Sequence, residues 1–292
     1  MIEQNKVIEG GLKRERKDPR DFSFGGVFGK VEVPIGDFTV AEPLEIKDQE
    51  INIPDGCTGY SLSAVSEDQE EVTLSPEFTF AMIKKIQGNW KSWGGGLREG
   101  CKSAVKIGFI EKSDVPFVVS EKDRNFLANW NNWPWELQLK AQKHAKQSFL
   151  RVDEGPDRFE AIRSALWANR GQKQSVYTGC TWRPGWLGAP NGVIPKEPKN
   201  GGVGHAIKAF GIKYINGEPY LMIQNSYGID VGDKGIFYFP RSVVNREFTY
   251  GAYQFIDLPQ AEIKGILREK GLLIETKPNF LNSFWQRIKE IF

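Results

Sequence analysis

The change in composition near residue 171 constrains the fold of this chain more than any other sequence feature. Before it, apolar residues recur every three or four positions, as Phe78, Met82 and Ile86 do after a capping Ser75. After it come five runs rich in β-branched and aromatic residues, QSVYTGCTW, GHAIKAFGIKYI, EPYLMIQNSYG, GIFYFPRSVV and GAYQFIDL. Asn216–Gly217 between two of them is a hairpin signal. The sequence therefore predicts an α+β fold with a helical first lobe and a sheet-rich second lobe.

The expected elements divide the chain into three regions. We expect an N-terminal arm over residues 1–45, a main domain over 46–258 and a C-terminal extension over 259–292. Within the main domain, the helical lobe covers about 46–128 and the sheet-rich lobe about 145–258. Helices are expected at 57–71, from Pro76 within 74–89, from Leu97 to before Gly108, at 134–149 and at 156–171, and GIFYFPRSVV at 235–244 is expected to be a strand.

Composition limits the classes of partner. The formal net charge of +2 does not favour nucleic acid, and no apolar run is long enough to span a membrane. The N-terminus has no secretory apolar core, and three cysteines do not form a disulfide framework, so we expect a cytoplasmic protein. No Cys/His cluster has metal-ligand spacing, so no metal or other cofactor is expected.

Three polar residues are candidates for chemistry. Cys57 follows a glycine at the start of an expected helix, where unpaired N–H groups and the helix dipole favour a thiolate. His205 opens one strand of the expected hairpin, and Asn225 ends the other. An amide oxygen beside the imidazole would fix its tautomer, so the three form a possible nucleophile, base and orienting group. Cys101 and Cys180 are expected to be buried packing thiols.

Over about residues 12–258 the chain resembles the papain-like cysteine peptidases, in particular their divergent bacterial and phage branch. GCTGYSLSA, GVGHAIKAFG and NSYGIDVGDKGIF are similar to the family's cysteine, histidine and asparagine motifs. The resemblance implies a two-lobed fold whose second lobe is barrel-like, with the active site in the cleft between the lobes. It also implies a thiol protease, a hydrolase that cleaves peptide or protein substrates without a cofactor. Gln49 would complete the oxyanion hole, and Gly94 and Gly95 would bind the substrate backbone.

The chain departs from the family pattern at several positions. The oxyanion glutamine is expected at position 51, which is Ile51, so Gln49 requires a two-residue insertion. Tyr227 replaces the tryptophan that shields the asparagine. A different register, aligning SLSAV with FSAV of papain, puts Gly59 at the place of the nucleophile. In that register Cys57 would stand near the family's structural cysteine, but its expected partner region, Ser92–Trp93, has no cysteine.

These departures leave a second interpretation open. The chain could be a weak or inactive papain-like module with a structural or binding role, for example as a virion component of a phage particle. Only 56 residues precede Cys57, fewer than an inhibitory propeptide of the usual length. The segment NFLNSFWQRIKEIF at 279–292 predicts an amphipathic helix that docks back on its own domain or on a protein partner or second subunit, with a membrane surface less favoured.

Overall fold

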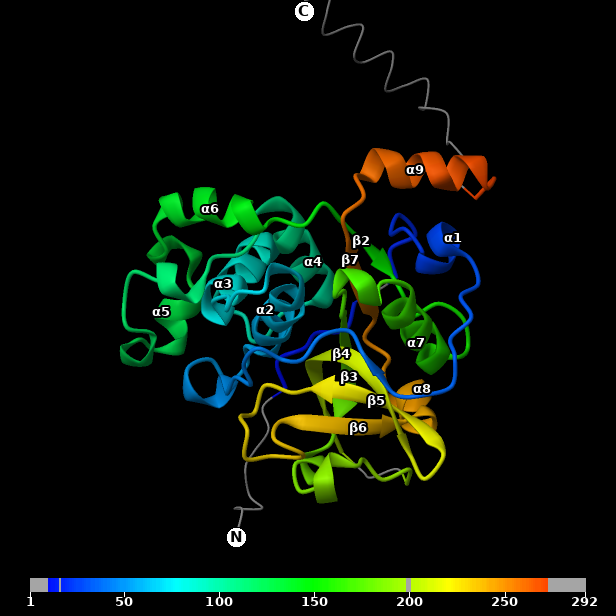
Figure 1. Ribbon diagram of the computed structural model, residues 1–292. Coiled ribbons are helices and arrows are strands. Elements are labelled where there is room, and N and C mark those ends of the chain that lie inside the picture. Colours follow the sequence, from blue (N-terminus) through cyan, green and yellow to red (C-terminus); the bar gives the residue numbers. More distant parts are fainter. Residues whose placement is uncertain (1–9, 16, 198–200, 273–292) are drawn as a thin grey trace, which may run out of the picture.

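The computed structural model describes residues 10–15, 17–197 and 201–272, and its helices and strands form two lobes (Figure 1). The helices are α1 (Phe24–Phe28), α2 (Cys57–Glu70), α3 (Pro76–Gln87), α4 (Leu97–Lys106), α5 (Arg124–Ala128), α6 (Trp135–Ala141), α7 (Arg158–Ala168), α8 (Arg241–Glu247) and α9 (Gln260–Glu269). The strands are β1 (Phe38–Thr39), β2 (Ser148–Arg151), β3 (Val176–Trp182), β4 (Val203–Ile215), β5 (Glu218–Gln224), β6 (Ile236–Pro240) and β7 (Ala252–Ile256). None of the described helices is long and apolar enough to cross a membrane.

Helices α2 to α6 form the first lobe. Helix α3 begins where its signals place it, since the Ser75 side chain accepts a hydrogen bond from the Phe78 amide and Pro76 occupies the first turn. Gly88 ends it with a φ of 73°, in the left-handed region that glycine adopts without strain. The expected helix over 134–149 is shorter: α6 ends at Ala141, and β2 already begins at Ser148.

The second lobe is built on one antiparallel sheet in the order β2-β7-β3-β4-β5-β6, with β1 paired to β4. This path is not cyclic among the described strands, so the barrel-like sheet stays open. The β4–β5 hairpin turns at Asn216 and Gly217, both with positive φ. The expected strand over 235–244 is wrong in its second half. After Pro240 the chain turns into helix α8, whose Val243 and Val244 are buried against the sheet.

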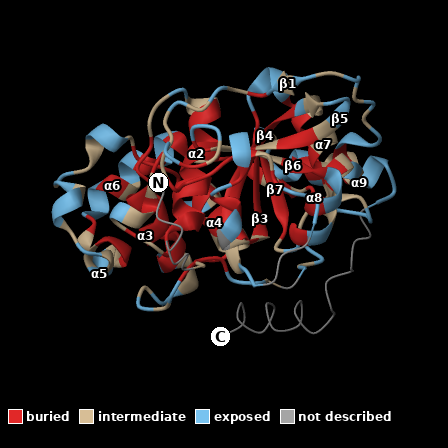
Figure 2. Cartoon of the chain, turned by 90° about the horizontal axis from the view of Figure 1, so that it is seen from below, coloured by how far each residue is buried: buried red, intermediate tan, exposed pale blue. Residues whose placement is uncertain are grey.

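Helix α2 lies between the lobes and is buried along almost its whole length (Figure 2). One apolar cluster joins Leu62 and Val65 of α2 to Ala206 of β4 and Tyr253 of β7. Polar contacts fix the same interface, because the Ser61 hydroxyl donates to the Ala206 carbonyl at 2.6 Å. A buried ion pair joins Lys208 Nζ to Asp68 Oδ1 at 2.5 Å. These contacts place the N-terminus of α2 beside β4.

The arm contacts both lobes, through α1 and β1 on the second lobe and through Asp21 on α4 of the first, and the first part of the C-terminal extension lies against the second lobe. Strand β1 pairs with β4, and Phe24 and Val27 of α1 belong to the core of that lobe, together with Ile263 and Leu267 of α9. Asp21 binds the Arg98 guanidinium at 2.8 Å. The predicted amphipathic helix over 279–292 lies outside the described residues.

Candidate functional site

Cys57 is the first residue of helix α2 and is fully buried. Backbone N–H groups of Ala206, Gly11 and Thr58 donate hydrogen bonds to its sulfur. The thiol therefore lies beside the residue that follows His205 in β4. Burial raises the pKa of Cys57 to about 12, and these hydrogen bonds oppose the rise only in part. In this state the thiol is protonated, although a helix N-terminus otherwise favours the thiolate.

His205 and Asn225 form a buried pair on neighbouring strands. The β4–β5 pairing brings the two residues together, and His205 Nε2 lies 2.7 Å from Asn225 Oδ1. Because an amide oxygen only accepts hydrogen bonds, Nε2 carries the proton and Nδ1 is the unprotonated nitrogen. Burial lowers the pKa of His205 to about 4, and the bond to Asn225 opposes this shift, so the imidazole is neutral near pH 7.

Tyr227 covers this pair on one side. Its ring stacks on the imidazole of His205 with centroids 4.7 Å apart and planes 10° from parallel. The Tyr227 hydroxyl lies 3.2 Å from Nδ1. Because Nδ1 carries no proton in this tautomer, the hydroxyl is the donor in this contact. Trp182 meets the same imidazole edge to face at 5.3 Å, and both aromatic rings keep water from the His205–Asn225 bond.

Gln49 is buried at the start of a short 3₁₀ turn, Gln49–Ile51, just before α2. Its Oε1 accepts a hydrogen bond from the Ser226 hydroxyl at 2.7 Å, and its Nε2 donates to the Pro54 carbonyl at 2.5 Å. The side chain therefore bridges the residue after Asn225 and the segment that leads to Cys57. Nε2 has a second hydrogen, which remains for an oxyanion.

An extended N-terminal segment, residues 10–13, crosses this site, and we call it the strap. On one side it pairs with the loop that contains Gly94 and Gly95, which we call the glycine loop. Gly95 N–H donates to the Gly11 carbonyl at 2.7 Å, and Lys13 N–H donates to the Gly95 carbonyl at 2.9 Å. On the other side Leu12 N–H donates to the Gly204 carbonyl at 3.0 Å. The strap thus bridges the two lobes over the Cys57 thiol.

Close backbone approach explains the glycines of the strap. A Cβ at Gly11 would lie 2.1 Å from the Asp55 carbonyl oxygen, and a Cβ at Gly94 would lie 1.9 Å from the Gly11 carbonyl oxygen. The Leu12 side chain is buried in the cluster that contains Cys57 and Ala206. Sequence reasoning missed the strap. Its only signal is the pair Gly10–Gly11 before an apolar residue.

The remaining sequence candidates lie elsewhere. Cys101 and Cys180 are free and buried, which confirms the prediction of packing thiols. Gly59 faces α3, because a Cβ there would lie 2.6 Å from Cβ of Phe80. In the alternative register the nucleophile would stand at position 59. A side chain at this position would point toward α3 of the first lobe and not toward β4. In the described part of the chain, no three His, Cys, Asp or Glu side chains are grouped so that they could hold a metal ion.

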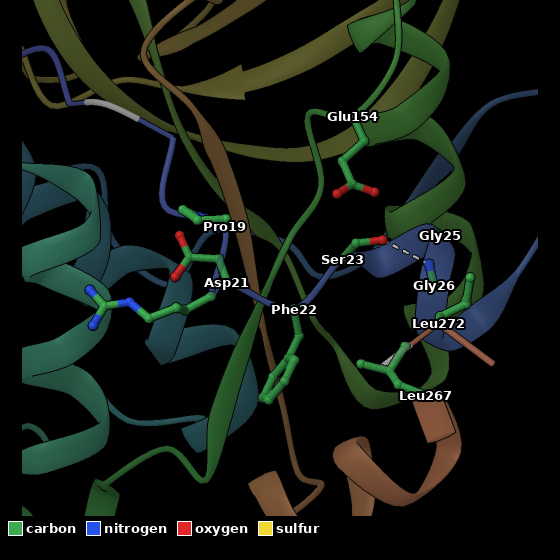
Figure 3. A pocket seen from close by; sticks show the side chains of 10 residues that line it. Pro19, Asp21, Phe22, Ser23, Gly25, Gly26, Glu154, Leu267 and Leu272 are labelled. Carbon is green, nitrogen blue, oxygen red and sulfur yellow. Dashed lines mark hydrogen bonds between the residues drawn. The ribbon is translucent and has the colours of Figure 1, made fainter. Parts of the chain in front are cut away.

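Two larger hollows lie outside this constellation. One, of about 520 Å³, is bounded by Asp21 and Phe22 of the arm, Glu154, and Leu267 and Leu272 at the end of the described chain (Figure 3). It contains no residue of the Cys57 site. The other, of about 700 Å³, is lined by residues 45–48 and 51–52, which flank Gln49, and by residues 228–230. The space directly over Cys57 is occupied by the strap.

No protein-family model matches the sequence, and no curated protein matches it either. Solved structures do match the fold. Xylellain, a cysteine protease from Xylella fastidiosa, is 20% identical with a TM-score of 0.64, over 85% of this chain and 96% of that one. Procathepsin B S9 from Trypanosoma congolense is 16% identical with a TM-score of 0.54, over 86% and 84%. Bromelain from Ananas comosus, in complex with the inhibitor E64, is 15% identical with a TM-score of 0.52, over 73% and 93%. The chain therefore has the two-lobed fold of the papain-like cysteine proteases.

Proposed function

We propose that the protein is a papain-like cysteine peptidase that hydrolyses peptide bonds in peptide or protein substrates. One observation carries this proposal. The Cys57 thiol begins a helix and lies beside the strand residue that follows His205, whose Nε2 is held by Asn225 at 2.7 Å. The papain-like fold agrees with this arrangement.

In the proposed reaction, Cys57 Sγ attacks the carbonyl carbon of the scissile bond, and its proton passes to Nδ1 of His205. The imidazolium gives this proton to the leaving amine as the C–N bond breaks, which leaves a thioester. His205 then accepts a proton from water, the hydroxide attacks the thioester, and the thiol is restored with release of the acid. Asn225 holds the ring in the tautomer that both steps need.

The negative oxygen of the tetrahedral intermediate would be held by Gln49 Nε2 and by the N–H of Cys57. Cys57 is the first residue of α2, so its backbone N–H has no hydrogen-bond partner within the helix. The bond from Ser226 fixes the orientation of the Gln49 amide, so the donor is preorganised. A donor of this kind stabilises the transition state by about 3 kcal/mol.

The strap holds the site in a closed state, and we propose that it leaves the cleft before a substrate enters. Its own bonds are poorly placed for cleavage. At Gly11 an N–H and not a carbonyl carbon faces the sulfur, and the Gly11 carbonyl is bound by Gly95. The Gly10 carbonyl accepts a hydrogen bond from the Trp93 indole at 3.0 Å, away from Gln49.

A non-catalytic papain-like module is the second candidate, and the burial of the thiol favours it. A fully buried Cys57 with a pKa of about 12 has no nucleophilic thiolate near pH 7 while the strap is in place. The two candidates therefore differ in what happens once the strap is displaced.

The test is peptide hydrolysis by the full-length Gly11→Ala protein, in which the added Cβ displaces the strap. A mixture of unstructured peptides is incubated with this protein and analysed by mass spectrometry, with Gly11→Ala/Cys57→Ser as the matched control. Cleavage that disappears with Cys57→Ser supports the peptidase. An accessible Cys57 without any cleavage supports the non-catalytic module.

A further inference from the structure

Three charged side chains outside the catalytic constellation lie beneath the glycine loop. Asp55 and Lys84 are fully buried, and the Arg124 side chain is 15% exposed. They come from three separate segments: the turn before α2, the last turn of α3 and the start of α5. Buried charges reduce stability unless they are paired and hydrogen-bonded, so this cluster requires a physical explanation.

Asp55 is the centre of the cluster. Arg124 binds it in a bidentate way, with Nε 2.9 Å from Oδ1 and Nη2 2.6 Å from Oδ2. The same carboxylate accepts a hydrogen bond from the Gly94 amide at 2.7 Å. Asp55 precedes Cys57 by only two residues. One side chain therefore connects the start of the helix that carries the thiol to the glycine loop.

Lys84 and Arg124 hold the carbonyl oxygens of the same loop. Lys84 Nζ donates to the Ser92 carbonyl at 2.6 Å, to the Ser92 hydroxyl at 2.8 Å and to the Gly94 carbonyl at 2.7 Å. Arg124 Nη2 also donates to the Ser92 carbonyl, at 2.9 Å. Both the N–H and the C=O of Gly94 are thus bound by charged groups, and Gly94 has a φ of 63°.

The cluster is unbalanced in charge, which argues against a purely stabilising role. Two cations face one carboxylate, and burial, with the charges of Lys13 and Arg124 next in order, lowers the pKa of Lys84 to about 7. Apolar residues of similar volume would often be at least as stable at such a place. What apolar residues cannot supply is a set of directed hydrogen bonds to the backbone of a glycine loop.

The residue next to this clamped glycine presents its backbone to the cleft. Gly95 donates its N–H to the Gly11 carbonyl and accepts the Lys13 N–H, so it binds an extended chain through one donor and one acceptor. A substrate peptide bound over Cys57 would need the same two groups. Their position relative to the thiol is set by the charge cluster, since loops without such contacts move readily.

We propose that Asp55, Lys84 and Arg124 are positioning residues that fix the Gly94–Gly95 loop relative to Cys57, so that an extended peptide main chain is held over the thiol. The part of this proposal that concerns substrate binding rests on the proposed peptidase function. The part that concerns the strap is independent of catalysis, because the strap is already an extended chain bound to Gly95.

The part that concerns the strap is tested in the full-length protein with a thiol-alkylating reagent, by following Cys57 labelling with peptide mass mapping. Arg124→Gln and Lys84→Met should each label Cys57 about tenfold faster than wild type, because a loosened loop holds the strap less well. The matched control is Arg151→Gln, which breaks an ion pair of similar burial with Asp153 in the second lobe. It should leave the Cys57 rate unchanged, and Arg124→Lys should restore part of the protection.

The part that concerns substrate binding is tested in the Gly11→Ala background, where the strap no longer competes. There Arg124→Gln and Lys84→Met should raise KM about tenfold and leave kcat within about twofold, since they weaken the hold on the peptide main chain and not the chemistry. The Arg151→Gln control should change neither constant. If Gly11→Ala cleaves no peptide at all, the proposed function fails, and Cys57 labelling alone decides the positioning proposal.

Two results would overturn the proposal. The first is Cys57 labelling in Arg124→Gln and Lys84→Met at the wild-type rate. The second is a parallel fall of kcat and melting temperature with KM unchanged, which indicates general loss of structure. Variants that unfold are recognised by labelling of Cys101 and Cys180. If Arg124→Gln or Lys84→Met unfolds, the milder variant Arg124→Lys is studied instead, by hydrogen exchange of the Gly95 and Lys13 amides. Protection of these amides equal to that in wild type counts against the proposal.

Discussion

The substitution Gly11→Ala tests whether the strap closes the Cys57 site. Its added Cβ would lie 2.1 Å from the Asp55 carbonyl oxygen and 2.7 Å from the Asp55 carbonyl carbon. Both are backbone atoms next to the start of α2, so they cannot move aside as a flexible side chain would. The strap must therefore shift or leave.

The size of the effect follows from this collision. Overpacking of a well-packed site costs about 1–3 kcal/mol. Since 1.4 kcal/mol is a factor of ten in an equilibrium constant, the open population should rise about 5- to 150-fold. Opening also restores water to Cys57, so its pKa should fall from about 12 as the desolvation that raises it is removed. A thiolate at a helix N-terminus reacts faster, which adds to the increase.

The assay is alkylation of Cys57 under native conditions, with quantitation of all three thiols by peptide mapping. Cys180 belongs to the separate core cluster of the second lobe and reports global opening, whereas Cys101 shares the cluster of Leu12 and Cys57. Gly25→Ala is the matched control in the same arm, because the nearest atom to its Cβ would be a glutamate oxygen of Glu154 at 3.8 Å, an ordinary contact. If Gly11→Ala labels Cys57 no faster than Gly25→Ala, or if all three thiols accelerate together, the strap does not close the site.

Three further outcomes follow from the site in the strap-released protein. Asn225→Ala should lower kcat about ten- to hundredfold and leave KM nearly unchanged, because His205 loses the 2.7 Å bond that sets its tautomer; steady-state kinetics of peptide cleavage measure this. Ser226→Ala should lower kcat about fivefold in the same assay, through loss of the bond that orients Gln49, and a change in KM alone would contradict this role. Burial lowers the pKa of His205 to about 4, against 6.5 for a solvent-exposed histidine. The unfolded chain therefore binds more protons between these values, and stability rises with pH across that window by up to about 3 kcal/mol. Denaturant unfolding should show this rise in Cys57→Ser and its loss in Cys57→Ser/His205→Gln; an equal pH dependence in both would refute it.

Local sequence signals were sufficient for most of the elements and for the His205–Asn225 pair. The Asn216–Gly217 turn fixes the hairpin, and a hairpin brings residues at the two far ends of its strands together. Ser75 and Pro76 fix the start of α3 because capping is a local interaction. Local signals did not predict helix α8, because its formation depends on packing against a distant part of the chain. Val243 and Val244 favour a strand locally, and burial of one helical face against the sheet overrides that preference.

The strap and the charge cluster could not be predicted, because their partners are far apart in the sequence. Asp55 and Arg124 are 69 positions apart, and a lone arginine in a helix carries no signal of a buried partner. Gly10 and Gly11 reveal their role only when Asp55 and Gly94 are placed beside them. The position of Gln49 was predictable only through the resemblance, since its two anchors, Ser226 and Pro54, lie on different segments.

In the proposed scheme, a substrate would bind the same two backbone groups of Gly95 that hold the strap. Any change that improves the hold of the glycine loop on an extended peptide also improves its hold on the strap, which is tethered and therefore present at a high effective concentration. A better-positioned loop would then raise the affinity of the open state for peptide. It would also lower the fraction of the protein that is in the open state. Under this scheme the apparent affinity of the full-length protein for peptide substrates depends little on the loop, and the strap contacts that a substrate does not copy decide how much of the protein is open. The Trp93 bond to Gly10 and the Gly11–Asp55 approach are such contacts. Substitutions there should change the open population without changing the intrinsic affinity for peptide.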